Sequence, residues 1–127
     1  MIIYIKENNE YKKISNHFTG ELTVLKNTEK AKYYGNRYGQ DVEPIGNYFI
    51  QKQANHLDKF DNYKTFKVQI NNPLIINVED DVIKWKYDLA KKYKAKGKKL
   101  SDKLKLDGYD FIITVYNNGE TGEIISL

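Results

Sequence analysis

The chain has 127 residues, a formal net charge of +4, an aromatic share of 13% and no cysteine. Its length fits one domain over residues 1–127, and its aromatic content argues against disorder. Without cysteine it can form no disulfide, thiolate nucleophile or cysteine-based zinc site, which is typical of a reducing, cytoplasmic compartment. The apolar start at residues 1–5 is too short for a signal peptide, and no apolar run reaches the roughly 20 residues that a membrane span needs. We therefore expect a single soluble domain.

The first third of the chain predicts two strands and a helix. Residues 2–5 are apolar and predict an opening strand, and residues 21–25 predict a second strand. A helix is expected to begin at residues 27–29, where Asn and Thr side chains can cap it. Tyr34 and Tyr38 would then lie on one face of this helix, and the glycines nearby would end it.

The middle of the chain continues with short strands and one clear helix. Residues 47–50 predict a short strand or extended stretch, and residues 66–70 alternate apolar and polar side chains as a half-buried strand does. Residues 71–73, Asn-Asn-Pro, end that strand, and residues 74–76 predict another short strand. Four apolar side chains then repeat at intervals of 3, 4 and 4, which predicts an amphipathic helix ending near Gly97: Val82, Trp85, Leu89 and Tyr93.

The last part of the chain predicts a short helix and a closing hairpin. Leu100 and Leu104 would lie on one face of the helix. Residues 111–116 and 122–127 predict two strands, and the Asn-Asn-Gly sequence at 117–119 is a strong turn signal between them. Strands at both ends with helices between them predict an α+β fold rather than a doubly wound α/β sheet.

Three segments, in this order, resemble small ADP-ribosyltransferase-like domains. The first, Gly20–Gly35, resembles their glycine-led strand that runs into a helix carrying Ala and paired aromatic residues. The second, Val68–Asn77, is similar to their strand, Asn-Pro-Leu and strand unit. The third, Gly108–Ile113 followed by Gly122–Ile125, resembles their C-terminal hairpin. The variants nearest in size and layout occur in phage and other mobile-element proteins, including some anti-CRISPR proteins.

The resemblance implies a split mixed or antiparallel sheet with short helices and a cleft for NAD as the substrate. It also implies transfer of ADP-ribose to a host or target macromolecule, a protein being the expected target, in the cytoplasm of a bacterial host if a phage encodes the chain. In that chemistry a carboxylate stabilises the positive charge that develops on the ribose. Glu123 matches the family's acidic position on the last strand, and Glu120 is the reserve candidate. An outward-facing strand position is the alternative for Glu123.

Further residues are candidates for holding NAD. Tyr34 and Tyr38 would form a wall for nicotinamide, although aromatic residues at helical spacing are also typical of a core. Thr23 would supply a hydroxyl. Arg37, the chain's one arginine, suits a pyrophosphate, with an ordinary surface position as the alternative. The family's first strand usually carries His or Arg against the ribose, and Tyr4 is the nearest residue to that position here.

Other catalytic signatures are missing from the sequence. His17 and His56 are far apart and there is no cysteine, so no metal-ligand spacing is visible and we expect no metal. The chain has no Walker loop, no GxGxxG and no GxSxG motif. Each histidine is expected to be a surface or loop residue.

The positive charge is concentrated in one segment. Residues 84–105 hold ten lysines and two aspartates, whereas the rest of the chain has 11 basic and 15 acidic residues. The lysines of Lys91–Lys99 could bind an acidic protein or a nucleic acid, or could be a solvated helix end opposing the helix dipole. This segment has no arginine and no aromatic residue beyond Tyr93, so sequence-specific recognition of a nucleic acid is not expected. A non-enzymatic binding or inhibitor module is therefore the second functional hypothesis.

Overall fold

The short apolar runs form strands and the two amphipathic segments form helices in a computed structural model of the chain. It describes residues 3–7, 10–14, 19–27, 33, 35–51, 63–78, 81–117 and 119–127, with the backbone alone for 3–7 and 10–14. The elements in chain order are β1 (Ile3–Glu7), β2 (Glu10–Ile14), β3 (Gly20–Asn27), β4 (Asn47–Phe49), β5 (Tyr63–Ile70), β6 (Pro73–Asn77), α1 (Lys84–Tyr93), α2 (Lys98–Leu106), β7 (Phe111–Val115) and β8 (Thr121–Ser126). The predicted α+β class is confirmed.

The largest sheet has four strands in the order β4-β8-β7-β6. β6 and β7 are parallel, and the other two pairs are antiparallel, so this sheet is mixed. α1 and α2 form the connection between the parallel strands, as a parallel pair requires a long crossover. β7 and β8 form the predicted closing hairpin. Two antiparallel pairs, β1 with β2 and β3 with β5, complete the strand pairing.

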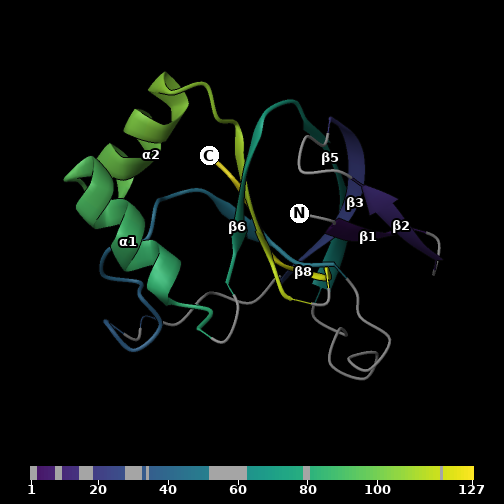
Figure 1. The fold of residues 1–127 in the computed structure, drawn as a ribbon, viewed down its shortest axis with the longest axis horizontal. Coiled ribbons are helices and arrows are strands. Elements are labelled where there is room, and N and C mark those ends of the chain that lie inside the picture. Colours follow the sequence, from purple (N-terminus) through teal and green to yellow (C-terminus); the bar gives the residue numbers. More distant parts are fainter. Residues whose placement is uncertain are drawn as a thin grey trace.

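The core lies on both faces of the four-stranded sheet because neighbouring residues of a strand point to opposite faces. Ile113 and Ile124 pack with residues of β3 and β5 on one face. Ile112 and Ile125 pack with residues of α1 and α2 on the other. Figure 1 shows the two helices on one side of the sheet and β3 and β5 on the opposite side. The sheet is therefore the middle of three layers.

One expected element differs from the structure. The helix expected to begin at residues 27–29 should carry Tyr38 and end at the nearby glycines, Gly35 and Gly39, but the described residues 35–42 form turns. Gly35 and Gly39 have φ angles of 62° and 71°, which lie outside the helical region. Tyr38 is thus a turn residue and not part of a helical face, and the other residues of the expected helix, apart from Tyr33, lie outside the described part.

Candidate functional site

Glu123 lies on β8 at an irregularity in the pairing of the closing hairpin. The register between β7 and β8 shifts between Ile113 and Val115. Opposite this point the Glu123 N–H donates to Thr114 Oγ1 at 2.7 Å, and a Cβ on Gly122 would lie 2.7 Å from that same oxygen. A bulge of this kind changes the direction of the side chain beside it. The close approach of Gly122 and of the Glu123 N–H to Thr114 therefore fixes where the carboxylate points.

The Glu123 side chain faces α1 across the sheet surface. Ile125, two residues later on the same strand, belongs to the cluster that packs against the helices. The Glu123 side chain is 32% exposed, and its Oε2 lies 3.8 Å from the Nζ of Lys86 on α1. The predicted carboxylate is therefore not on the outer surface of the hairpin but in the space between β8 and the first helix.

Lys86 is the centre of this space and is almost fully buried. Its side chain is 7% exposed, and Nζ donates to Glu43 Oε2 at 2.6 Å and to the Tyr38 carbonyl at 3.0 Å. The same ammonium lies 5.7 Å from the ring centroids of both Tyr48 and Trp85. One buried cation thus holds together α1, β4, β8 and the turn segment before β4.

The turn segment reaches Lys86 because of a glycine. A Cβ on Gly39 would lie 2.8 Å from Lys86 Cδ, and its φ of 71° is one that L side chains rarely adopt. The Gly39 carbonyl accepts the Glu43 N–H at 2.9 Å, which closes the turn. The backbone therefore passes directly over the lysine stem and returns Glu43 to the ammonium group.

A cavity of about 680 Å³ opens beside this charged cluster. Its volume lies within the range of small-molecule sites, roughly 300–1,000 Å³. Glu123 and Lys86 form part of its wall, together with two tyrosines, Tyr38 and Tyr48. The remaining lining residues come from β3, the turn segment and the α1–α2 connection: Lys26, Gln40, Glu43, Pro44, Ile45, Gly46 and Gly97. The cavity therefore combines two carboxylates, two lysine side chains and two aromatic rings.

The electrostatics of the site perturb two groups. Burial raises the pKa of Glu123 above its ordinary value of 4.5, whereas Lys86 lowers it and the nearby Glu43 raises it. The Trp85 indole also lowers that pKa, although its buried Nε1 has no partner within hydrogen-bond geometry among the described residues. Burial, and then Glu43 and Glu123, raise the pKa of Tyr48. Tyr48 therefore stays a neutral phenol, whose hydroxyl donates to the Pro44 carbonyl at 2.7 Å.

The raised pKa of Glu123 predicts a pH dependence of stability. The folded chain holds the proton of the Glu123 carboxyl group more tightly than the unfolded chain does. The free energy of unfolding therefore falls as pH rises from 4.5 through the raised pKa of Glu123. Glu123→Gln cannot ionise and should lose less stability across that window. The check is urea unfolding of both proteins between pH 4 and 8. A stability difference that is constant with pH, or that changes in the opposite direction, would contradict this assignment.

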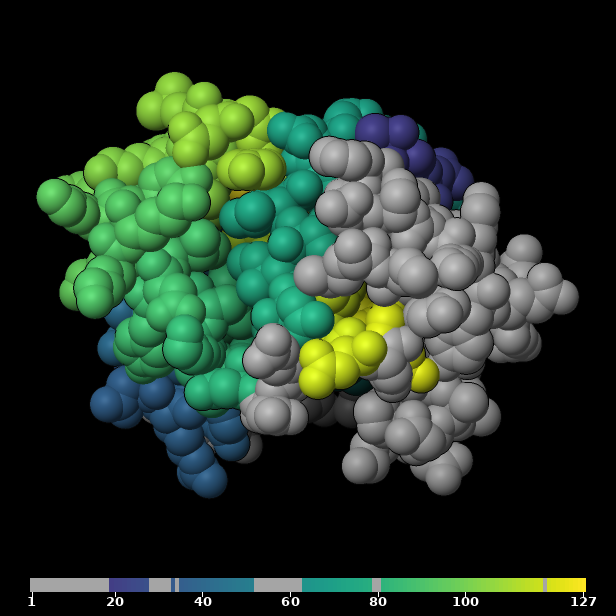
Figure 2. Space-filling model, in the orientation of Figure 1, coloured from purple at the N-terminus to yellow at the C-terminus, as the bar shows by residue number. Residues whose placement is uncertain are grey.

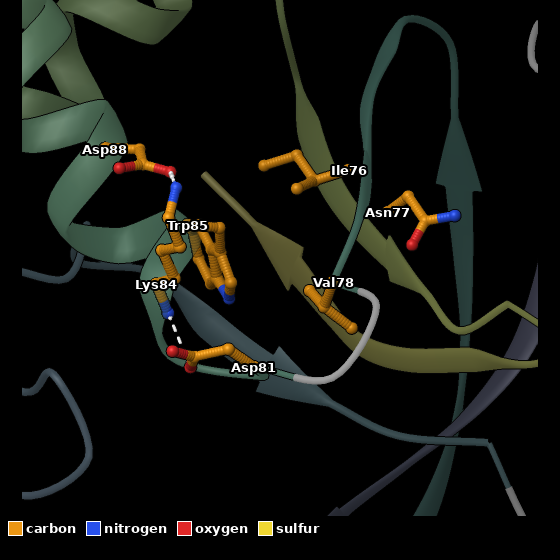
Figure 3. A pocket seen from close by; sticks show the side chains of 7 residues that line it. All are labelled: Ile76, Asn77, Val78, Asp81, Lys84, Trp85 and Asp88. Carbon is orange, nitrogen blue, oxygen red and sulfur yellow. Dashed lines mark hydrogen bonds and ion pairs between the residues drawn. The ribbon is translucent and has the colours of Figure 1, made fainter.

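A second cavity of about 380 Å³ lies between the end of β6 and the start of α1. Figure 3 shows Trp85 and Val78 at its wall, with Asp81 beside the first turn of the helix. Asp81 Oδ1 accepts the Ile83 N–H at 2.9 Å and the Lys84 N–H at 3.1 Å, which satisfies the free amides at the helix start. Asp81 is thus engaged in holding the start of α1.

The structure brings two of the predicted site residues, Glu123 and Tyr38, to the same cavity. Arg37 is exposed, and its guanidinium lies 5.5 Å from the Tyr38 ring centroid. Thr23 is exposed on the side of β3 away from the core and does not line this cavity. The side chain of Tyr4, on β1, lies outside the described residues, as does the whole of Tyr34.

The other candidates stand apart from this cavity. The Glu120 carbonyl accepts the Tyr116 N–H at 2.9 Å at the end of the hairpin, and Glu120 does not line the cavity. His17 and His56 lie outside the described residues. Lys26 in the cavity wall was not predicted. Three further residues of the site were also not predicted, and each is placed by contacts distant in sequence: Glu43, Tyr48 and Lys86.

Searches for other signatures of function gave no result. Across the described residues, no group of three or more His, Cys, Asp or Glu side chains is arranged to hold a metal ion. No helix within that same part of the chain has the length and apolar character to cross a membrane. Comparison with protein-family models, with curated proteins and with solved structures found no match.

Proposed function

We propose that this chain is an NAD-dependent ADP-ribosyltransferase that uses the 680 Å³ cavity to hold NAD. The observation that carries the proposal is the position of Glu123. The resemblance of the sequence assigns the catalytic carboxylate to this residue, and its side chain borders a cavity of ligand size beside two tyrosines. A merely structural outward-facing glutamate would have neither the cavity nor the buried cation beside it.

The contacts between two of the resembling segments support the same proposal. Asp110 of the third segment accepts the N–H groups of Asn71 and Asn72 of the second, both at 2.8 Å. The Asn72 side chain in turn donates to the Gly108 carbonyl at 2.9 Å. The Asn-Pro-Leu turn and the start of the closing hairpin thus form one unit that fixes β6 against β7.

The proposed reaction requires little covalent work from the protein. The bond between nicotinamide and ribose C1′ breaks, nicotinamide leaves with the electron pair, and a nucleophile of the acceptor bonds to C1′ and releases its proton to solvent. Ionised Glu123 stabilises the positive charge on the ribose. Tyr38 and Tyr48 offer aromatic surface to nicotinamide, while Lys26 in the wall and Arg37 beside Tyr38 supply cations for the pyrophosphate.

Glu123→Gln should remove the transfer activity while the fold is retained. Removing one preorganised electrostatic stabiliser costs about 10²–10³ in rate. The measurement is incorporation of labelled NAD into bacterial lysate, together with nicotinamide release from NAD alone. Glu21→Gln is the matched control, because Glu21 is an exposed strand glutamate that pairs with Lys67 at 3.6 Å on another sheet. Label that persists in Glu123→Gln would exclude Glu123, and loss in Glu120→Gln instead would assign the reserve residue.

The second candidate is a binding or inhibitor module without turnover. One observation favours it: the six lysines of the 91–99 segment are all exposed. If wild-type protein neither labels the lysate nor releases nicotinamide, whereas it binds an acidic partner in a salt-dependent way, this second function replaces the first.

A further inference from the structure

Six exposed lysines form a continuous basic segment from the last turn of α1 to the first turn of α2. We call them the lysine ridge: Lys91, Lys92, Lys94, Lys96, Lys98 and Lys99. The helices that carry them form one outer end of the molecule, shown in green in Figure 2. Asp88 pairs with Lys84, outside the ridge, at 2.6 Å, and of the six lysines Lys98 is paired, with Asp102 at 3.0 Å. The ridge therefore keeps a large positive charge.

The needs of the fold do not explain this charge. Lysines in the last turn of α1 do oppose the negative end of its dipole. Lys98 and Lys99, however, open α2 at its positive end, where no acidic residue occupies the first turn. Lys94 has a φ of 52°, a conformation that favours Gly or Asn. Three of the six lysines thus occupy positions where another residue type would stabilise the fold better.

The ridge is continuous with the wall of the cavity. Gly97, which lines the cavity, lies between Lys96 and Lys98 in the chain. The Ser101 hydroxyl of α2 donates to the carbonyl of Ile45, another lining residue, at 2.7 Å. The α1–α2 connection is therefore fixed against the cavity wall, and Gly97, in the middle of the ridge, borders the same cavity as Glu123.

The composition of the ridge indicates the class of ligand. Protein interfaces depend on aromatic and arginine anchors in pockets and are poor in lysine. Within residues 91–99, all of them described, no large hydrophobic side chain is exposed. A nucleic acid backbone, by contrast, is bound by exposed cations that neutralise phosphates without any pocket. We propose that the lysine ridge binds the phosphodiester backbone of a nucleic acid strand and leads that strand into the cavity as the acceptor.

Binding to the ridge stands by itself, whereas the role of the strand as acceptor rests on the proposed transferase function. In that step a ring nitrogen or hydroxyl oxygen of the strand forms the bond to ribose C1′, nicotinamide leaves, and the proton of the nucleophile passes to solvent. The lysines touch phosphates and not the reacting atoms, so they are positioning residues. The binding does not depend on ionised Glu123.

The test uses fluorescently labelled single-stranded DNA, single-stranded RNA and duplex DNA, titrated with the full chain at several salt concentrations. Replacing Lys96 and Lys98 by Gln should weaken binding and lower the slope of log K against log salt by about 2, roughly 1 for each phosphate that is no longer neutralised. Replacing Lys64 and Lys67 by Gln is the matched control on β5. Each pair includes one lysine in an exposed ion pair, Lys98 with Asp102 and Lys67 with Glu21.

The outcomes separate the two proposals. Binding that is weakened in the ridge variant but kept in the control and in Glu123→Gln supports the ridge as the binding surface. NAD label that nuclease removes supports the strand as acceptor. Label on protein alone, sensitive to Glu123 but not to the ridge, keeps the transferase and overturns the nucleic acid acceptor. Equal loss in both lysine variants, or tighter binding to polyglutamate than to any strand, overturns the ridge as a nucleic acid surface.

Discussion

Lys86→Met should lower the free energy of unfolding by about 3–5 kcal/mol. Breaking a buried ion pair from one side leaves an uncompensated charge, and this is the usual cost. Here the loss falls on Glu43, bonded at 2.6 Å, and on Glu123 at 3.8 Å, and the Tyr38 carbonyl is left without this donor. Since native proteins are stable by about 5–15 kcal/mol, this loss is a large fraction of the total stability. Urea unfolding followed by circular dichroism measures the effect.

Lys84→Met is the control on the same helix. Lys84 pairs with Asp88 across one helical turn, both side chains being mostly exposed, and such a pair contributes about 0.3–0.5 kcal/mol. Adding Glu43→Gln to Lys86→Met should recover part of the lost stability, because it removes one of the stranded carboxylates. A loss in Lys86→Met no larger than that of Lys84→Met would show that the buried cation does not hold the site together.

Trp85→Ala should also destabilise the fold by about 3–5 kcal/mol. Trp85 is 4% exposed and packs in the cluster between the helices and the sheet, where the 380 Å³ cavity already borders it. Truncation of Trp85 would enlarge that cavity and remove the packing of the first turn of α1 against the sheet. Trp85→Phe keeps most of the aromatic volume and removes an indole N–H that has no hydrogen-bond partner among the described residues, so it should cost less than about 1.5 kcal/mol. Similar losses in both variants would contradict this account of the packing.

The strands and helices that follow residue 46 were predictable because local pattern and tertiary packing agree there. The spacing of Trp85, Leu89 and Tyr93 predicts α1, and the structure buries Trp85 and Leu89. The strand β2 was not predicted, and its sequence, Glu-Tyr-Lys-Lys-Ile, is mostly polar. Tyr38 was expected on a helix that ends near Gly35 and Gly39, whereas residues 35–42 form turns. The spacing of the aromatic residues was given more weight than these two glycines, which both adopt positive φ.

The candidate site was predictable only in part. Glu123 and Tyr38 could both be proposed from the resemblance to ADP-ribosyltransferase-like domains. The exposed position of Thr23 follows from alternation, since Leu22 and Val24 are both in the core. Lys86 was missed because a lysine on an amphipathic helix is ordinarily solvated. Glu43, its partner 43 residues away, comes to it only through the folded chain, and no local pattern contains that contact.

Trp85 has a consequence for measuring ligands. It is the one tryptophan in the sequence, and the Lys86 ammonium lies 5.7 Å from its ring centroid. Indole fluorescence responds to charge and water in its surroundings, and the neighbouring Lys86 and Glu123 line the larger cavity. A molecule that enters there and displaces either charge will change the emission of a single, buried fluorophore. Binding of nicotinamide, NAD and nucleotides can thus be tested on the unmodified protein by following the fluorescence of Trp85.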